Sequence, residues 1–278
     1  MERNAPLLNE APHPQAGHSD CRAALQHILI GCVQALEGHR SPAADGDADA
    51  VHKMRIELTR LSSALLFFSP ILTDSGWSRI ASRVRSLNSR LGRARDQDVM
   101  LQYSSRRRYR GWAQGNLRSV ERTRAKRYRK LAANLCSGGY RRLLRDIDQQ
   151  ARRPALPIDD EPHSADVALF AEMRLPEWRS EIQQSGRHLG KLDPKQQHRL
   201  RLKCKYYRYV VDSLLELGAG LAFQDLLFRD VAKQLHTSLG DARDLRRFKS
   251  TGHGRPPRYR ATKKRLLNAA AAALRGRR

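Results

Sequence analysis

The same basic signature occurs twice in this chain, and this internal repeat constrains the fold more than any other feature. The first copy links His52–Arg55 to Leu91–Asp96, and the second links His198–Arg201 to Leu239–Asp244. The two histidines are 146 residues apart, and the two Leu-Gly pairs are 148 residues apart. Similar segments at a nearly constant separation indicate that one supersecondary unit has been duplicated. We therefore expect two related halves.

Positive charge is the second constraint. The 278 residues include 53 Lys and Arg against 28 Asp and Glu, a net charge of +25. The stretch 79–145 holds 20 Lys and Arg but only three acids. Such a surface attracts phosphate chains, nucleic acid or anionic lipid. An even spread of charge would have favoured a protein that is merely basic, so a large polyanion is the expected partner.

Targeting signals are weak. No apolar run approaches the ~20 residues that a membrane-spanning helix needs, and the polar N-terminus lacks the apolar segment of a secretory signal. The four cysteines are scattered without a Cys-x-x-Cys pair, which disfavours disulfides and a zinc site and favours a reducing compartment. We expect a cytoplasmic protein without membrane association and without a metal or other cofactor.

Helical periodicity dominates, so the prediction is an all-α protein. Residues 1–19 are expected to be disordered, 20–151 to form a first helical unit, 152–164 to be a proline-containing linker and 165–278 to form a second helical unit. The predicted helices cover about 20–38, 50–68, 78–102, 114–136, 138–151, 165–190, 194–217, 223–240 and 258–275. Asp193 before Pro194 is a strong start signal.

The repeated helix has two opposite sides in each copy. In the first, His52, Arg55 and Thr59 lie opposite an apolar stripe, with Lys53 and Arg60 at its flanks. In the second, the same side carries His198, Arg201, Lys205 and Arg208, and Arg199 matches Lys53. A solvated face normally mixes charges of both signs, whereas these two faces begin with cations and histidine alone. The pattern favours ligand binding over a solvated surface.

Neighbouring helices add further cations. Residues 78–102 present Arg79, Arg83 and Arg90 on one side, and residues 114–136 present Arg122, Lys126 and Lys130. These side chains could converge on one groove or could be ordinary surface residues. In 223–240, Val231 and Ser238 replace Arg83 and Arg90, so the second half is predicted to be the less basic wall.

The Leu-Gly segments leave two questions open. Arg95 and Arg243, each followed by an aspartate, either contact the ligand or form an internal Arg–Asp pair, and Asp96 and Asp244 are interpreted as structural. A glycine inside a helix costs about 1 kcal/mol relative to alanine. The repetition of Gly92 and Gly240 therefore indicates a close backbone approach, or a helix end.

These motifs closely resemble the CHAD domain (conserved histidine α-helical domain) over about residues 20–275. The resemblance implies two four-helix bundles related by a pseudo-twofold axis, which flank a basic central cleft or channel that binds inorganic polyphosphate. It also implies association with polyphosphate granules. The chain departs from the family pattern at Thr59, where an arginine is usual, and at Asp241, which stands where the first copy has Arg93.

The predicted function is thus polyphosphate binding without catalysis. Many Lys and Arg can neutralise a phosphate chain with release of counterions, and arginine matches phosphate oxygens bidentately. A bound anion would favour charged histidines, which predicts tighter binding near pH 6 than near pH 8. The predicted polyphosphate-binding residues are His52, Lys53, Arg55, Arg60, Arg83, Arg90, Arg93, Arg95, Arg122, Lys126, Lys130, His198, Arg199, Arg201, Lys205 and Arg208.

Three alternatives remain. A nucleic-acid-binding protein fits the charge, although aromatic residues make up only 6% of the chain and no helix-turn-helix or zinc finger is recognisable; weak non-specific binding is expected. A polyphosphate-processing enzyme would normally need carboxylates that hold Mg²⁺, and the basic faces begin without them. A granule scaffold overlaps with the binding prediction.

Overall fold

The computed structural model describes residues 20–72, 76–153, 166–250 and 255–275, and these form an all-α protein. Within these ranges no strand occurs, and the only β-type pairing is an isolated bridge between Asp20 and Asp166. The predicted disordered segment 1–19 and almost all of the predicted linker 152–164 lie outside the described residues. The described residues contain no helix that combines the length and the apolar character needed to cross a bilayer.

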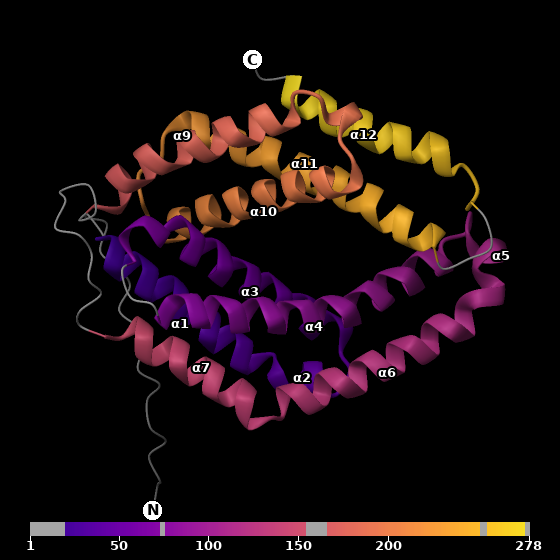
Figure 1. Ribbon diagram of the computed structural model, residues 1–278, viewed down its shortest axis with the longest axis horizontal. Coiled ribbons are helices and arrows are strands. Elements are labelled where there is room, and N and C mark those ends of the chain that lie inside the picture. Colours follow the sequence, from indigo (N-terminus) through magenta and orange to yellow (C-terminus); the bar gives the residue numbers. More distant parts are fainter. Residues whose placement is uncertain (1–19, 73–75, 154–165, 251–254, 276–278) are drawn as a thin grey trace, which may run out of the picture.

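The first half is built from five long helices and two short ones (Figure 1). They are α1 (Cys21–Gly38), α2 (Arg40–Ala44), α3 (Ala48–Phe67), α4 (Gly76–Ser105), α5 (Arg110–Ala113), α6 (Leu117–Leu135) and α7 (Gly138–Ala151), with 3-10 turns η1 (Ser69–Ile71) and η2 (Gln114–Asn116). Helices α6 and α7 follow one another around a sharp bend, and together they cover the outer side of α4 and α1.

The described part of the second half contains four helices, so α6 and α7 jointly occupy the position that the last of these four fills here. The four are α9 (Val167–Gly186), α10 (Pro194–Glu216), α11 (Phe223–Lys249) and α12 (Tyr259–Arg275), with the 3-10 turn η3 (Leu189–Lys191) before α10. The equivalent helices α3 and α10, one from each half, pack against each other, and the equivalent helices α4 and α11 also meet. These four helices form the inner wall of the molecule.

Local sequence explains most helix boundaries. The predicted start at Pro194 is confirmed: the Asp193 carboxylate accepts hydrogen bonds from the backbone N–H groups of Lys195 and Gln196 at 2.6 and 2.9 Å. The predicted end near residue 240 is wrong, because α11 continues through Gly240 to Lys249. Leu245 and Phe248 extend its apolar side and are almost fully buried, so packing offsets the glycine.

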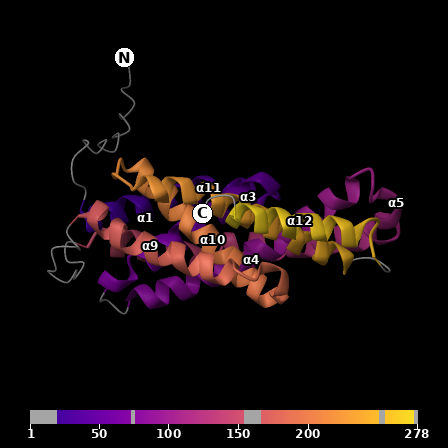
Figure 2. The ribbon, with the colours of Figure 1, turned by 90° about the horizontal axis from the view of Figure 1, so that it is seen from above.

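Two apolar clusters join the halves and leave a space between them. At one end Phe67 of α3 packs edge-on against Phe170 and Trp178 of α9, with ring centroids 5.3 and 5.6 Å apart. At the other end Phe248 of α11 packs against Tyr103 and Tyr109, with both centroid distances 5.3 Å. Seen from above, the halves overlap along the long axis (Figure 2), so the inner helices are fixed at both ends.

Candidate functional site

Equivalent residues of the two repeats meet at the interface between the halves. Lys205 Nζ donates a hydrogen bond of 2.6 Å to Thr59 Oγ1, and these two residues are separated by the repeat distance of 146. A residue can contact its own counterpart only near the axis that relates the two copies. The position where the sequence departs from the CHAD pattern is therefore filled by the lysine of the other half.

The repeated glycines lie against the repeated arginines. A Cβ atom on Gly92 would lie 3.7 Å from the Arg55 guanidinium group, and one on Gly240 would lie 3.2 Å from Arg201 Nε. Both glycines lie inside helices, so the helix-end alternative is wrong. The group that lies against each glycine is an arginine side chain and not a second backbone. Gly240 on α11 thus makes room for Arg201, whereas the contact of Arg55 with Gly92 on α4 is an ordinary van der Waals distance.

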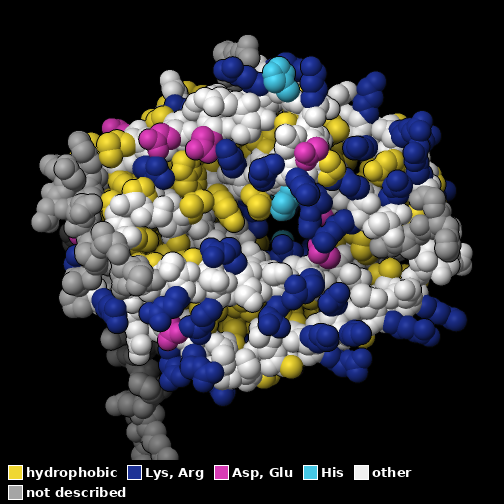
Figure 3. All heavy atoms as spheres, in the orientation of Figure 1, with side chains coloured by type: hydrophobic (Ala, Val, Ile, Leu, Met, Phe, Trp, Pro, Cys, Tyr) yellow, Lys and Arg dark blue, Asp and Glu magenta, His cyan; other side chains and the backbone are white. Residues whose placement is uncertain are grey.

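A channel of about 200 Å³ lies between the halves and is lined by all four inner helices. Figure 3 shows a hollow near the middle of one face, with basic side chains, a histidine and an acidic side chain around it. The lining residues are His52, Arg55 and Ile56 of α3, Arg95, Asp96 and Val99 of α4, Arg201, Lys205 and Tyr209 of α10, and His236, Arg243 and Asp244 of α11.

A second basic hollow shares Arg243 with the channel. This hollow, which we call the outer basin, has a volume of about 620 Å³ and is lined by Pro194, Lys195, His198, Arg199, Arg243, Arg246 and Arg247. It includes the first residues of α10, where the partial positive charge of the helix N-terminus favours an anion. The channel and the outer basin together give a basic surface that runs along α10 and α11.

Burial makes the charged form of three channel cations less favourable and lowers their pKa values. Burial lowers the pKa of Arg201 from 12.5 to about 10, with a further lowering from Arg243 that Asp244 partly opposes. Burial also takes the pKa of Lys205 well below its usual 10.5, and the nearby arginines add to this effect. The Arg55 pKa is lowered mainly by burial as well. The lining itself holds five Lys and Arg against two aspartates, so positive charge exceeds negative charge in the channel.

Several buried donors in this region lack a partner. The Nε–H groups of Arg55, Arg201 and Arg208 are buried and have no hydrogen-bond acceptor among the described residues, and Nε2 of His236 is likewise buried there without a hydrogen-bond partner. An unsatisfied buried donor costs about 1–3 kcal/mol. A ligand with many acceptor oxygens would remove this penalty together with the excess of positive charge.

All three histidines near the channel are biased towards the neutral form. Burial is the first cause for His52 and His198, and their neighbouring arginines lower the pKa of each further below 6.5. His236 is the extreme case, since burial and then Arg201 lower its pKa to about 2. An anion in the channel would act in the opposite direction and raise the three pKa values.

Of the two aspartates of the repeated motif, Asp96 joins the halves and Asp244 pairs within its own helix. Asp96 of α4 forms an ion pair with Arg247 and lies 3.7 Å from Arg243, and both arginines belong to α11. Arg243 also lies 3.2 Å from Asp244. The structural interpretation of the two aspartates agrees with these contacts. Arg243 forms the internal pair and also lines the channel, and its contact with a ligand stays a prediction.

The structure brings together only part of the predicted set. His52, Arg55, Arg95, Arg201 and Lys205 line the channel, and His198 and Arg199 line the outer basin. The ligand contacts themselves stay predictions.

The other nine predicted residues line neither the channel nor the outer basin, because each pairs with a nearby acid or is exposed to solvent. Those with acidic partners are Lys53 (Asp49, 2.9 Å), Arg60 (Glu216), Arg83 (Asp146) and Arg208 (Asp212, 3.7 Å). Those that are exposed outside the channel are Arg90, Arg93, Arg122, Lys126 and Lys130, of which Arg93 donates to Ser89 Oγ at 2.9 Å. Helical spacing placed these residues on a polar side, but that side meets solvent or an acid, and only the acid of Arg60 comes from the other half.

The second half is not the less basic wall of the channel. It supplies Arg201, Lys205 and Arg243, whereas the first half supplies Arg55 and Arg95. The prediction compared outward-facing positions such as Arg83, which do not reach the channel. Sequence reasoning also missed His236, Arg246 and Arg247. Continuing the helical periodicity of residues 223–240 past Gly240 would have placed Arg243 and Arg247 on the same side as His236.

Comparisons with known proteins agree with this architecture. The family model described as "CHAD domain" matches residues 27–251. A crystal structure of the CHAD domain from the plant Ricinus communis is similar, with a TM-score of 0.72 and 20% identity over 99% of this chain and 98% of that chain. PptA from Streptomyces chartreusis has a TM-score of 0.58 and 14% identity over 92% and 93% of the two chains. No curated protein sequence matches the chain.

Proposed function

Because this chain belongs to the CHAD domain family, which is associated with polyphosphate binding in general, we propose that its central channel and outer basin bind inorganic polyphosphate. A polyphosphate chain carries about one charge per phosphorus along a flexible backbone and has no apolar part. Recognition therefore requires closely spaced cations and N–H donors, rather than an apolar pocket.

The observation that carries this proposal is the excess of positive charge inside the channel, where five Lys and Arg face two aspartates. Arg55, Arg201 and Lys205 come from both halves, all have lowered pKa values, and two of them keep an unpartnered buried Nε. A purely structural cluster would be expected to contain paired charges. The entering anion supplies the missing negative charge and the missing acceptors.

We further propose that the protein binds polyphosphate without cleaving it, and that binding brings the protein to polyphosphate granules in the cytoplasm. The described residues contain no group of three His, Cys, Asp or Glu side chains placed to hold a metal ion. Phosphoryl transfer generally relies on carboxylate-held Mg²⁺ to neutralise the developing charge. The two carboxylates at the channel, Asp96 and Asp244, are already engaged with arginines.

The test is a titration with polyphosphates of graded length at two salt concentrations, on a matched pair of double variants. Arg201→Met with Lys205→Met removes two channel cations, and Lys126→Met with Lys130→Met removes two exposed cations of α6. The channel variant should bind at least about tenfold more weakly, since charged hydrogen bonds contribute about 1.5–3 kcal/mol each, and the α6 variant should bind almost normally. Equal losses in the two variants would contradict the proposal.

Two further measurements separate the alternatives. Polyphosphate should displace DNA at a much lower phosphate concentration than DNA displaces polyphosphate, because the exposed cations of α6 offer DNA only a non-specific surface. Incubation of long polyphosphate with the protein and Mg²⁺, followed by sizing on a gel, should leave the chain length unchanged. Shortened chains would reject the non-enzymatic part of the proposal.

A further inference from the structure

A third basic hollow lies at the end of the molecule where α4 leads into α5. It has a volume of about 820 Å³, which is larger than the channel and the outer basin. Its lining residues are Tyr103, Arg106, Arg107, Arg108 and Tyr109 from the first half, and Asp241, Thr262, Arg265 and Leu266 from the second half. We call it the arginine pocket. Like the channel, it is completed only when the halves come together.

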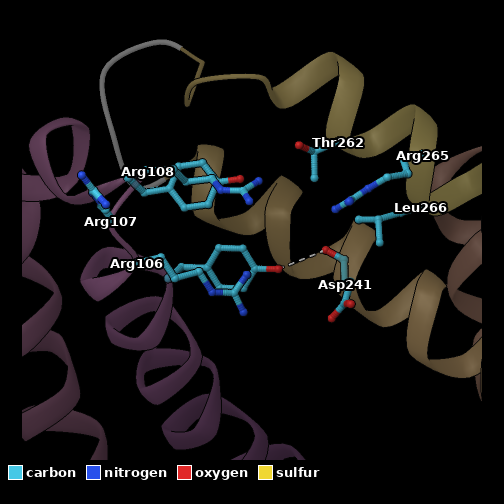
Figure 4. Close-up of a pocket in the computed structure, with 9 residues that line it drawn as sticks. Arg106, Arg107, Arg108, Asp241, Thr262, Arg265 and Leu266 are labelled. Atoms are coloured by element: carbon cyan, nitrogen blue, oxygen red, sulfur yellow. Dashed lines mark hydrogen bonds between the residues drawn. The ribbon is translucent and has the colours of Figure 1, made fainter.

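The arginines of this pocket are free of acidic partners. None of Arg106, Arg107, Arg108 and Arg265 forms an ion pair within the described part of the chain. Figure 4 shows Arg106 and Arg108 reaching inward from one side and Arg265 from the other, whereas Arg107 is turned away. Asp241 is the one acid of the lining. The pocket therefore gathers more positive than negative charge.

Aromatic rings hold two of these arginines in place. The Arg106 guanidinium carbon lies 4.0 Å from the centroid of the Tyr103 ring, and that of Arg108 lies 5.7 Å from the centroid of Tyr109. The two tyrosine rings stack on each other at 6.1 Å, and the Tyr103 hydroxyl donates to the backbone oxygen of Asp241 at 3.5 Å. Arginines that rest on a fixed aromatic floor lose less entropy when they bind a phosphate.

The arginine pocket adjoins the channel along two helices. Val99 lines the channel and Tyr103 lines the pocket, one turn further along α4. On α11, Asp244 lines the channel and Asp241 lines the pocket. Arg243, which the channel shares with the outer basin, points roughly 160° away from Asp241 around the helix axis. The outer basin and the arginine pocket thus lie on different sides of α11, with the channel bordering both.

From this placement we propose that the arginine pocket is a further phosphate-binding subsite, which holds a segment of the same polyphosphate chain after it leaves the channel. This proposal rests on the proposed function. It assigns to the pocket a preference for long chains, because a short chain held in the channel does not reach Arg106, Arg108 and Arg265. A long chain gains their contacts without the entropy of a second association.

The test compares tripolyphosphate with a long-chain polyphosphate on two triple variants. Arg106→Gln, Arg108→Gln and Arg265→Gln empty the arginine pocket of inward-pointing charge. Arg141→Gln, Arg142→Gln and Arg145→Gln remove the same charge from exposed positions of α7, near the opposite end of the molecule. Far-UV circular dichroism and the thermal unfolding midpoint verify that both variants are folded.

The pocket variant should bind tripolyphosphate like the unchanged protein and long chains about tenfold more weakly. Its plot of log K against log salt for long chains should also be shallower by about two, since each lost phosphate contact reduces the slope by about 0.7–0.9. The α7 variant should keep the long-chain preference. The same length dependence in the pocket variant and the unchanged protein, or an equal loss in both variants, overturns the subsite. An unchanged protein that binds neither ligand would instead reject the proposed function.

Discussion

Replacing Arg201 by methionine should make the free protein more stable while it weakens polyphosphate binding. Arg201 is mostly buried in the channel, its Nε has no acceptor among the described residues, and its pKa falls from 12.5 to about 10. That fall corresponds to roughly 3 kcal/mol of unfavourable free energy for the charged guanidinium group. Methionine keeps much of the apolar stem and removes the charge.

The net gain should be smaller than that value. Arg201 also faces Asp244 and Asp96, and some of its attraction to them is lost on substitution, although Arg243 remains 3.2 Å from Asp244. We expect the free energy of unfolding to rise by about 1–2 kcal/mol, with a rise in Tm of roughly 2–6 °C. Because the lowered pKa still lies far above neutrality, Arg201 is charged in the folded and unfolded states alike, and the gain should be constant between pH 5 and pH 8.

The assay is urea unfolding without ligand, followed by calorimetric titration with polyphosphate. Arg199→Met is the control, since Arg199 is exposed in the outer basin and its loss should change stability by less than about 0.5 kcal/mol. Saturating polyphosphate should reverse the order of stability, because the unchanged protein binds it more tightly. A folded Arg201→Met protein that unfolds at lower urea than the unchanged protein would refute the reasoning.

Three other predictions follow from the same geometry. Polyphosphate affinity should be higher at pH 6 than at pH 8, since the anion raises the lowered pKa values of His52 and His198 and binding then takes up protons; an unchanged affinity in calorimetry at the two pH values would contradict this. Gly240→Ala should weaken polyphosphate binding several-fold, because the added Cβ would lie only 3.2 Å from Arg201, whereas Gly92→Ala, with its Cβ 3.7 Å from Arg55, should bind normally. Equal affinities of the two variants would show that Gly240 does not position Arg201. Arg60→Ala should lower the free energy of unfolding by about 1 kcal/mol, because Arg60 loses its contacts to α10. Polyphosphate affinity should stay within twofold of the unchanged protein. A large drop in affinity would show that Arg60 contributes to binding after all.

The inward-facing pair of arginines could be predicted from sequence because two independent signals coincide. Arg55 and Arg201 recur at the repeat distance, and a glycine that is unfavourable in a helix recurs with each of them. The helical period placed each arginine opposite an apolar stripe, and the structure buries that stripe in the core. Repetition of an otherwise costly residue was the informative part of the pattern.

The same periodicity could not assign Arg60 or the α6 cations. Arg60 lies on the polar flank of α3, and only the docking of α10 brings Glu216 and Ser213 to it. Arg122 and Lys126 share a side of α6 that faces away from the channel, because the other side packs on α4. His236 lies outside the repeated motif, so the repeat did not single it out. Its place in the channel depends on how α11 crosses α10.

By itself the sequence determined the helices, their duplication and the side of each helix on which its cations lie, because these depend on propensity, capping and a period of 3.6 residues. The tertiary structure decided which of those cations are enclosed between the halves and which meet solvent or an acid. The physical reason is solvation. An exposed guanidinium group is solvated by water, whereas Arg201 and Lys205 are buried between two positively charged halves and lose that solvation.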